Sequence, residues 1–216
     1  LIVGGVAGGA TAAARLRRLD ETAEIVLLEK NAYISFANCG LPYYIGGVIK
    51  DEDDLLLQTP ESFRERYNVD VRVFHEAVSI DRAAHTVHVR TADGMEYDEP
   101  YDKLLLSPGA SPIVPPMDNA DDPRVFTLRN IPDTRRIHAF VRDNKPRRAV
   151  IAGCGYVGLE LAENLIAAGV SVTAIDLADS VIAPLDRDMA AEVHGYLEKR
   201  GVELLLSAAL TGIQKD

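Results

Sequence analysis

The feature that most constrains the fold is a pattern that occurs twice: an apolar stretch, a glycine-rich turn and a segment that favours a helix. Residues 1–20, LIVGGVAGGATAAARLRRLD, carry the first copy, and residues 147–169, RRAVIAGCGYVGLELAENLIAAG, carry the second. A further apolar stretch follows each copy, at residues 25–28 and 170–175. Apolar strands that alternate with helices form parallel sheets with covered faces. The fold is therefore predicted to be α/β, with two three-layer Rossmann-like units.

The region between the two copies has a different pattern. Residues 60–67, PESFRERY, predict a short helix with Thr59 as its N-cap and Pro60 at its first position. Residues 69–99 alternate in polarity around the turn at Asp93–Gly94, which indicates a β-meander.

A proline-rich stretch at residues 111–123 predicts a crossover between domains, and a helix is expected over about 132–144. We expect one domain over residues 1–113 and another over residues 114–216. The chain begins inside a strand at Leu1 and ends without a closing element, so we expect it to be part of a longer polypeptide.

Composition excludes several classes of function. The net charge is −10 without long blocks of one sign, so nucleic acid is not an expected partner. No apolar run approaches the ~20 residues of a membrane-spanning helix, and no signal peptide is visible. The two cysteines have dissimilar surroundings and the five histidines are scattered, so neither a disulfide framework nor a metal site is expected. A reducing, cytoplasmic location is favoured.

The second glycine turn, GCGYVG at residues 153–158, matches the dinucleotide fingerprint G-x-G-x-x-G. Gly153 permits the tight turn, Gly155 lets the backbone approach a pyrophosphate, and Gly158 lets helix and strand pack closely. Asp176 follows the next strand, where a carboxylate accepts ribose hydroxyls and repels a 2′-phosphate. This pattern favours NADH over NADPH, and a purely structural turn is the alternative.

The first glycine turn, GGVAGG at residues 4–9, is imperfect. Gly4 and Gly9 hold the outer positions, but Val6 replaces the middle glycine. Glu29 lies 20 residues beyond Gly9, at the end of the second apolar stretch. Because the pattern is duplicated, we expect two dinucleotides, one a hydride donor and the other a flavin.

Cys39 lies in the stretch SFANCGLPYYIGG, residues 35–47. The neighbours Asn38, Gly40 and Pro42 argue against a core strand and favour the start of a short helix, where a thiolate is stabilised. A nucleophilic Cys39 is therefore favoured over a buried, inert one.

No second cysteine accompanies Cys39, because the residue five positions on is Tyr44. Cys39 would then act alone, through a sulfenic acid or a mixed disulfide with a small thiol. Cys154 occupies a variable position of the second turn and is expected to have no chemical role.

Taken together, these segments resemble the flavin-dependent pyridine nucleotide–disulfide oxidoreductases. Within that family they are most similar to coenzyme A-disulfide reductases and NADH-dependent persulfide reductases. The resemblance is carried by GGVAGGATAAARLRRLD, SFANCGLPYYIGG, LLLSPGASP, FTLRNIPDT and GCGYVGLELAENL. It implies that NADH on the second domain reduces FAD on the first, and that the flavin reduces a disulfide or persulfide between Cys39 and coenzyme A.

The resemblance also implies site residues. The FAD contacts would be Gly4, Val6, Ala7, Gly8, Gly9, Glu29, Lys30, Asn38, Ala77, Val78, Ser107, Pro108 and Gly109. The NADH contacts would be Gly153, Gly155, Tyr156, Val157, Gly158, Glu160 and Asp176, with Tyr156 as an aromatic gate and Glu160 near the nicotinamide. The coenzyme A contacts would be Thr11, Arg15, Arg18, Ser35, Asn38 and Arg66.

Alternatives remain open for several of these residues. Tyr156 could instead serve in core packing, and Glu160 could be an ordinary surface acid. The arginines of RLRR could belong to a solvated helix face. Arg15 also departs from the uncharged residue usual in the family. The family's C-terminal segments, which complete the flavin site and form a homodimer, are not in this sequence. An NADH oxidase or peroxidase that uses a Cys39 sulfenic acid is the alternative activity, and a redox-sensing nucleotide-binding module without turnover is the third hypothesis.

Overall fold

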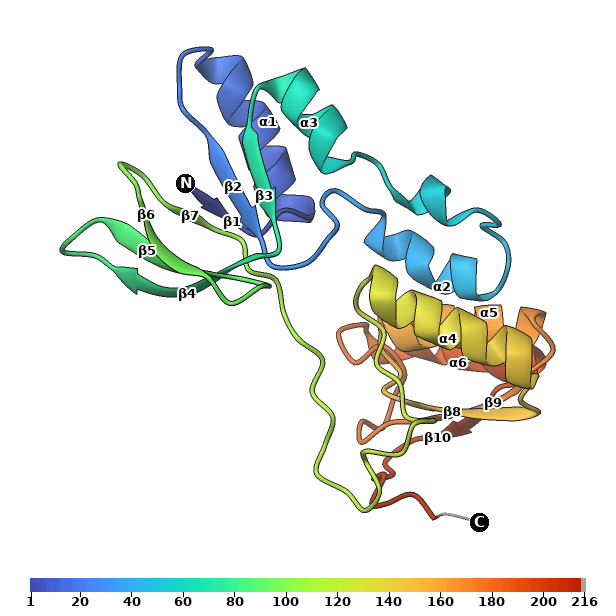
Figure 1. Cartoon of the computed structure of the whole chain (residues 1–216). Coiled ribbons are helices and arrows are strands. Elements are labelled where there is room, and N and C mark those ends of the chain that lie inside the picture. The colour runs from blue at the N-terminus through green and yellow to red at the C-terminus, as the bar shows by residue number, and fades with distance from the viewer. Residues whose placement is uncertain (215–216) are drawn as a thin grey trace. The chain divides into compact units, whose positions relative to one another are not determined.

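The computed structural model describes residues 1–214, which form two compact units (Figure 1). The first unit contains residues 1–37 and 55–110. The second contains residues 38–54 together with the described residues from 111 onward. The segment with Cys39 therefore lies in the second unit, and the division in the crossover falls between Ala110 and Ser111.

A four-stranded parallel sheet forms the centre of the first unit, with the strand order β3-β2-β1-β7. Ile2 lies opposite Leu27 on one side and Leu105 on the other. The strands are β1 (Ile2–Val3), β2 (Val26–Glu29), β3 (Asp70–Val73) and β7 (Leu105–Leu106). Helices α1 (Ala7–Leu19) and α3 (Pro60–Tyr67) lie on one face of this sheet (Figure 1).

The opposite face of the sheet is covered by an antiparallel meander with the order β4-β5-β6. Its strands are β4 (His75–Asp81), β5 (Thr86–Thr91) and β6 (Glu96–Pro100). Adjacent residues of β2 serve the two layers: Leu27 belongs to the core with α1 and α3, and Leu28 packs with Val87 and Val89 of the meander. The first unit therefore has the three layers expected from the sequence.

The meander is shorter than expected. Residues 69–99 were all expected to belong to it, but Asp70–Val73 pairs in parallel with β2 instead. Val69 and Val71 are buried in the core beneath α1 and α3, so the alternation there marks the edge strand of the parallel sheet. Phe74, at a left-handed φ of 62°, separates the two sheets.

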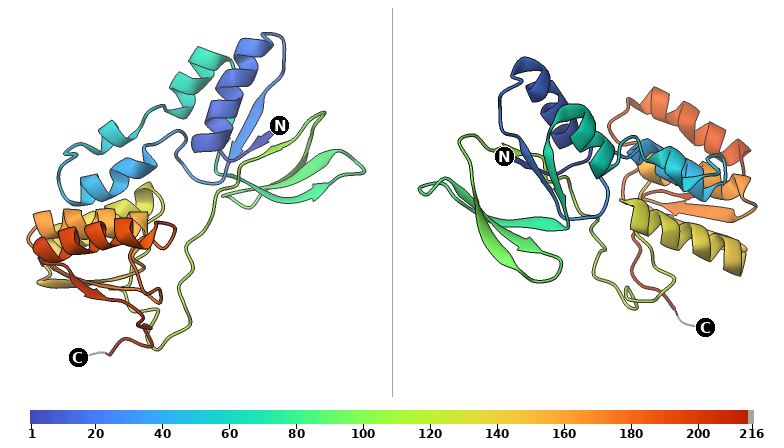
Figure 2. Two further views of the ribbon diagram at one scale, coloured as in Figure 1. Left: turned by 180° about the vertical axis from the view of Figure 1, so that it is seen from behind. Right: turned by 45° about the horizontal axis from the view of Figure 1, so that its top comes forward.

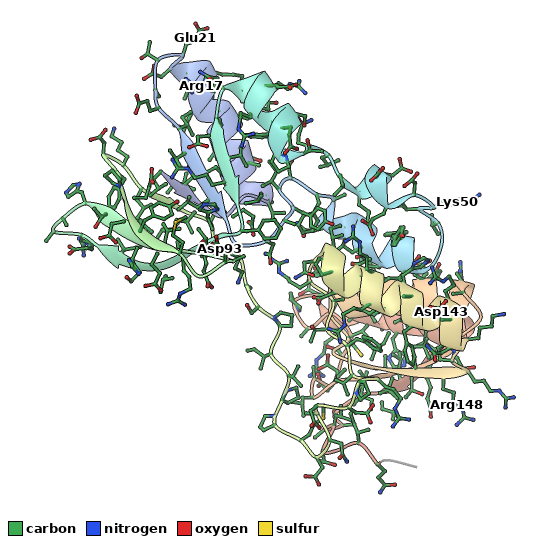
Figure 3. The ribbon with its side chains drawn as sticks, in the orientation of Figure 1. Arg17, Glu21, Lys50, Asp93, Asp143 and Arg148 are labelled. Carbon is green, nitrogen blue, oxygen red and sulfur yellow. The ribbon has the colours of Figure 1, made fainter. Side chains whose placement is uncertain are left out.

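Side-chain bonds define the ends of the first unit's helices. Thr59 accepts a hydrogen bond from the Ser62 backbone N–H at 3.2 Å, and Ser62 Oγ accepts one from the Thr59 N–H at 3.0 Å, so the predicted cap of α3 is confirmed. Arg17, near the end of α1, donates to the carbonyl oxygens of Tyr67 and Asn68 at 2.8 and 2.7 Å (Figure 3). This guanidinium therefore ties α1 to the C-terminal end of α3.

A three-stranded parallel sheet forms the base of the second unit, with the order β10-β9-β8. Its helices lie on one face of the sheet, with the short α2 on their outer side (Figures 1 and 2). The strands are β8 (Arg148–Ala152), β9 (Ser171–Ile175) and β10 (Glu203–Leu205). The helices are α2 (Leu41–Ile45), α4 (Ile131–Asn144), α5 (Tyr156–Ala167) and α6 (Arg187–Lys199), and α4 confirms the helix expected over 132–144.

The other face of this sheet is exposed within the described residues. Val150 of β8 is 60% exposed and Leu205 of β10 is 41% exposed. The third layer expected for this unit is therefore not formed by residues 1–214.

Candidate functional site

The glycine turn of the second unit has the geometry of a dinucleotide cradle. Gly153 follows β8 with φ +106°, and Gly155 caps α5. A Cβ on Gly158 would lie 2.0 Å from the Gly153 carbonyl oxygen, so this position requires glycine. Apart from Gly155 and its two chain neighbours, no atom of residues 1–214 lies within 4 Å of the place where a Cβ on Gly155 would stand. The start of α5 is therefore open to an approaching pyrophosphate, which fits a bound dinucleotide.

Asp176, after β9, is fixed beside this turn. One carboxylate oxygen accepts a hydrogen bond from the Cys154 N–H at 2.6 Å, and the other accepts one from the Ala178 N–H at 2.9 Å. The side chain remains partly exposed. Because each carboxylate oxygen has two acceptor positions, Asp176 can hold the turn and still accept ribose hydroxyls.

The glycine turn of the first unit repeats this geometry in spite of Val6. Gly4 has φ +94°, and a Cβ on Gly9 would lie 1.7 Å from the Gly4 carbonyl oxygen. A Cβ on Gly158 would clash in the same way with the Gly153 carbonyl oxygen. A Cβ on Gly8 would lie 2.3 Å from the hydroxyl oxygen of Ser107, which follows β7. The half-buried Val6 is the N-cap of α1. The turn therefore brings together α1, β1 and the start of the SPGA segment, residues 107–110.

Glu29 stands in the first unit where Asp176 stands in the second. It is only 5% exposed, and its two oxygens accept hydrogen bonds at 2.9 Å from the backbone N–H groups of Gly5 and Asn31. The Asn31 side-chain amide donates a third at 2.9 Å. The sequence led us to expect cofactor contacts for both carboxylates, with ribose hydroxyls as the partners of Asp176. Their bonds to the turns were missed, and the only available signal was a similar spacing, 24 residues from Gly5 to Glu29 and 22 from Cys154 to Asp176.

Cys39 is an exposed free thiol in a single 3-10 turn, η1 (Asn38–Gly40). Helix α2 begins directly after it, with Pro42 in its first turn and with Leu41 and Ile45 buried. The short helix after Cys39 is thus confirmed. The reactivity of the Cys39 thiol stays a prediction.

Cys154 differs from Cys39 in its surroundings. It is 1% exposed within the second glycine turn. Burial, with a smaller contribution from the nearby Asp176 carboxylate, raises the pKa of its thiol to about 11. Cys154 is therefore held as the neutral thiol at physiological pH.

The predicted coenzyme A contacts divide between the units. Thr11, Arg15 and Arg18 are exposed on α1 at spacings of four and three residues, which places them on one helix face. Ser35 also lies in the first unit, with φ 44°, whereas Asn38 lies in the second. The remaining predicted contact is Arg66, exposed on α3, with its guanidinium carbon 5.4 Å from the centre of the Tyr67 ring.

The remaining predicted cofactor contacts lie as follows. Tyr156 and Val157 are 61% and 53% exposed in the first turn of α5, and Glu160 is half-buried one turn later. In the first unit, Ala7 begins α1, Lys30 is exposed beside Glu29, Ala77 and Val78 lie at the bulge of β4, and Ser107, Pro108 and Gly109 follow β7. The exposure of Tyr156 argues against the core-packing alternative.

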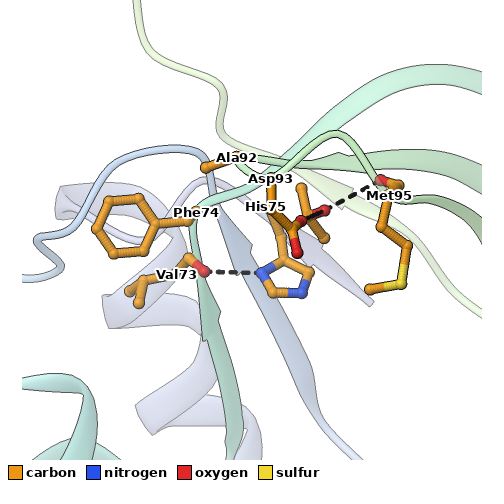
Figure 4. Close-up of a pocket in the computed structure, with 7 residues that line it drawn as sticks. Val73, Phe74, His75, Ala92, Asp93 and Met95 are labelled. Carbon is orange, nitrogen blue, oxygen red and sulfur yellow. Dashed lines mark hydrogen bonds between the residues drawn. The ribbon is translucent and has the colours of Figure 1, made fainter.

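The first unit also contains a shallow pocket of about 440 Å³ where the meander meets β3 (Figure 4). His75 Nδ1 lies 2.7 Å from the Val73 carbonyl oxygen, so Nδ1 donates a hydrogen bond to that oxygen. The Thr91 hydroxyl donates to Asp93 and lowers the pKa of that carboxyl. No predicted site residue lines this pocket, which is formed by Val73, Phe74, His75, Thr91, Ala92, Asp93 and Met95.

Two features that would indicate other functions are absent from residues 1–214. No helix in this range is long and apolar enough to cross a membrane. Over the same range, no group of three or more His, Cys, Asp or Glu side chains is arranged to hold a metal ion.

Comparisons with known proteins agree with this geometry. The family model for pyridine nucleotide-disulphide oxidoreductases matches residues 1–216. The coenzyme A disulfide reductase of Staphylococcus haemolyticus is 38% identical over 218 residues, which cover 99% of this chain and 48% of that protein. The chain thus spans about half the length of this curated relative.

Two solved structures are similar over almost the whole chain. The crystal structure of reduced Bacillus anthracis CoADR-RHD has a TM-score of 0.95 and 47% identity, and the match covers 99% of this chain and 39% of that one. The structure of an NAD-dependent persulfide reductase from A. fulgidus has a TM-score of 0.92 and 34% identity, and the match covers 99% of this chain and 40% of that one. Both similarities extend through the two glycine turns and the Cys39 segment.

Proposed function

Because the chain belongs to the pyridine nucleotide-disulphide oxidoreductase family, we propose that it is the dinucleotide-binding part of an NADH-dependent flavoenzyme that reduces a small disulfide through Cys39. The observation that carries this proposal is the repeated turn geometry. Each unit has a turn that requires glycine and a carboxylate hydrogen-bonded to that turn. Two such cradles in one chain suit a pair of dinucleotides, FAD on the first unit and NADH on the second.

The second unit would bind NADH through its own backbone and one carboxylate. The open space at Gly155 admits the pyrophosphate to the free N–H groups at the start of α5. Asp176, already oriented by the Cys154 N–H, accepts the ribose hydroxyls. A 2′-phosphate would meet this carboxylate, and the surrounding residues 175–180, IDLADS, contain no arginine to compensate. The preference for NADH follows from this charge.

The first unit would hold FAD in the same way. Gly4, Gly8 and Gly9 bring the start of α1 against Ser107, and Glu29 lies at the end of β2 beside the turn. When bound, a flavin supplies the transfer of an electron pair from a reduced nicotinamide to a disulfide. The chain's part is to bind and orient both dinucleotides and to present the sulfur.

Cys39 would carry the sulfur chemistry. Its thiolate attacks one sulfur of the substrate disulfide, the S–S bond breaks, and the other half leaves as a thiolate. The mixed disulfide that remains on Cys39 takes up two electrons and a proton, which releases the second thiol and restores Cys39. The exposure of this residue allows such an attack.

We propose coenzyme A disulfide or a coenzyme A persulfide as the substrate. The support comes from the named relatives and from the exposed face with Thr11, Arg15 and Arg18, where cationic side chains suit phosphates. Polysulfide is a further candidate acceptor. The homodimer and the cytoplasmic location implied by the resemblance belong to this proposal for the full-length protein.

The test uses the full-length protein that contains this chain. NADH oxidation is followed with coenzyme A disulfide, with polysulfide and with oxygen alone, in the parent protein and in Cys39→Ser and Cys154→Ser. We expect disulfide-dependent turnover in the parent protein and in Cys154→Ser, and loss of nearly all of it in Cys39→Ser. Turnover with oxygen alone would favour an NADH oxidase, and NADH binding without turnover on any acceptor would favour a redox sensor. Undiminished disulfide reduction in Cys39→Ser would falsify the role of this sulfur.

A further inference from the structure

The segment that carries Cys39 is attached to the second unit by a contact between two helices. Gly46 ends α2, and a Cβ there would lie 2.6 Å from Oδ1, 2.7 Å from Cβ and 2.9 Å from the carbonyl oxygen of Asn164 in α5. All three distances are shorter than a real Cβ tolerates. Because Gly46 has an ordinary φ of −79°, glycine is needed here for close approach and not for backbone conformation.

Asn164 is a buried polar residue that the proposed function leaves unexplained. It is 2% exposed, and the other buried residues of α5 are the apolar Leu159, Ala162 and Leu165. Its Nδ2 donates to the Glu160 carbonyl oxygen at 2.8 Å, which fixes the orientation of the amide within its own helix. A fixed side chain makes a rigid support, so the position of Gly46 is set by α5.

Two contacts from α4 hold the rest of the segment. The ring of Tyr44 lies 4.6 Å from the ring of His138, measured between centroids. Glu52 accepts two hydrogen bonds from the Arg135 guanidinium, one of them at 2.6 Å from Nε. The segment is therefore held before and after Gly46, and a change at Gly46 must be absorbed by the short helix itself.

The sulfur is close to this support along the chain. Cys39 lies in η1, and α2 begins two residues later, so no flexible stretch separates the thiol from the helix that Gly46 ends. The supporting helix α5 starts at Tyr156, eight residues before Asn164, or about 12 Å along a helix. One helix thus carries both the predicted NADH contact and the support of the Cys39 segment.

We propose that Gly46 and Asn164 are positioning residues for Cys39: their contact fixes the thiol relative to the nucleotide-binding helix α5. The inference rests on the proposed function for its catalytic consequence. It also predicts a change in the chemical reactivity of Cys39 that does not depend on turnover.

The test compares two neighbouring glycines in the full-length protein. Gly46→Ala introduces the clash with Asn164 without backbone strain. Gly47→Ala is the matched control. Gly47 has φ +77°, and beyond its chain neighbours none of the described residues lies within 4 Å of its Cβ position, so this substitution brings strain without a clash. The measurements are disulfide-dependent NADH oxidation, NADH oxidation with ferricyanide, which accepts electrons without a thiol, and the rate of Cys39 alkylation mapped by mass spectrometry.

We expect Gly46→Ala to lower kcat with the disulfide by about 10- to 100-fold, the usual cost of displacing a reacting group by about 1 Å. Ferricyanide reduction should stay within about twofold, and the alkylation rate of Cys39 should change by at least about threefold. Gly47→Ala should leave all three measurements near the parent values. Equal effects of the two substitutions would overturn the proposal.

Two further variants keep the test decisive if Gly46→Ala does not fold. Asn164→Ala removes the rigid support and should change the alkylation rate of Cys39, so parent-like alkylation and turnover would count against the proposal. In the double variant Gly46→Ala with Asn164→Gly, two of the three short contacts are gone, and part of the lost turnover should return. If Cys39→Ser retains disulfide reduction, the proposed function fails, whereas the alkylation measurement still decides the positioning role.

Discussion

The two cysteines of this chain should differ in reactivity by a factor that the structure sets. In an unfolded chain the thiol of Cys154 has a pKa near 8.5, so roughly a tenth of it is thiolate at pH 7.5. In the folded protein the pKa of Cys154 is raised to about 11, which leaves roughly 0.03% as thiolate. Because the thiolate is the reacting form, ionisation alone should slow alkylation of Cys154 by about 300-fold. Its 1% exposure should slow the reaction further.

The assay is alkylation by iodoacetamide at pH 7.5 in native buffer and in denaturant, with the modified peptides quantified by mass spectrometry. The denatured chain gives the reference rate for each cysteine in its own sequence. The exposed Cys39 should react in the native protein, whereas Cys154 should remain unmodified over the same time. Raising the pH from 7.5 to 9.5 should still leave Cys154 mostly protonated. Native labelling of Cys154 within tenfold of its denatured rate would refute the reasoning, because neither the burial nor the raised pKa could then be right.

Two further predictions concern a glycine and a histidine. Gly158→Ala should weaken NADH binding and destabilise the fold by about 1–3 kcal/mol, since its Cβ would meet the Gly153 carbonyl oxygen. Gly195→Ala in α6 should stabilise the fold by about 0.5–1 kcal/mol, because within residues 1–214 no atom outside the local helix backbone lies within 4 Å of its Cβ position. Calorimetry and NADH titration measure both, and similar effects of the two substitutions would contradict the packing argument. The pKa of His88 is raised, chiefly by its hydrogen bond to Asp98, so its contribution to stability is present below the unfolded pKa and is lost as pH rises through the folded value. Asp98→Asn should lower that pKa in an NMR titration, and an unchanged titration would show that the cross-strand bond does not form in solution.

Local patterns were sufficient to predict the parts of this fold that neighbouring residues determine. The two glycine turns, the cap at Thr59 and the helix that became α4 each depend on residues within a few positions of one another. A strand was assigned to the wrong sheet where a sequence pattern was compatible with two structures. The alternation at residues 70–73 suits a meander strand and an edge strand of the parallel sheet equally, and only burial beneath α1 and α3 decides between them.

In the candidate site, too, the features set by neighbouring residues could be predicted, and those set by tertiary packing could not. The outer glycines could be identified from spacing, and an exposed Cys39 before a short helix could be expected from its neighbours. The contact between Gly46 and Asn164 that supports this helix could not be predicted, because the two residues are far apart in the sequence and neither belongs to a periodic pattern. The hydrogen bonds from the glycine turns to Glu29 and Asp176 likewise depend on strand order, which local sequence does not specify.

The bond between Glu29 and Gly5 also has a consequence for how the first sheet assembles. Leu27 and Leu28 of β2 face two different apolar layers, so sliding the strand by one residue would exchange them with little loss of burial. Hydrophobicity alone therefore leaves the alignment of this strand ambiguous. Only one alignment brings the Glu29 carboxylate within 2.9 Å of the Gly5 N–H. Glu29, one of the predicted cofactor contacts, thus also favours the correct alignment of β2 during folding.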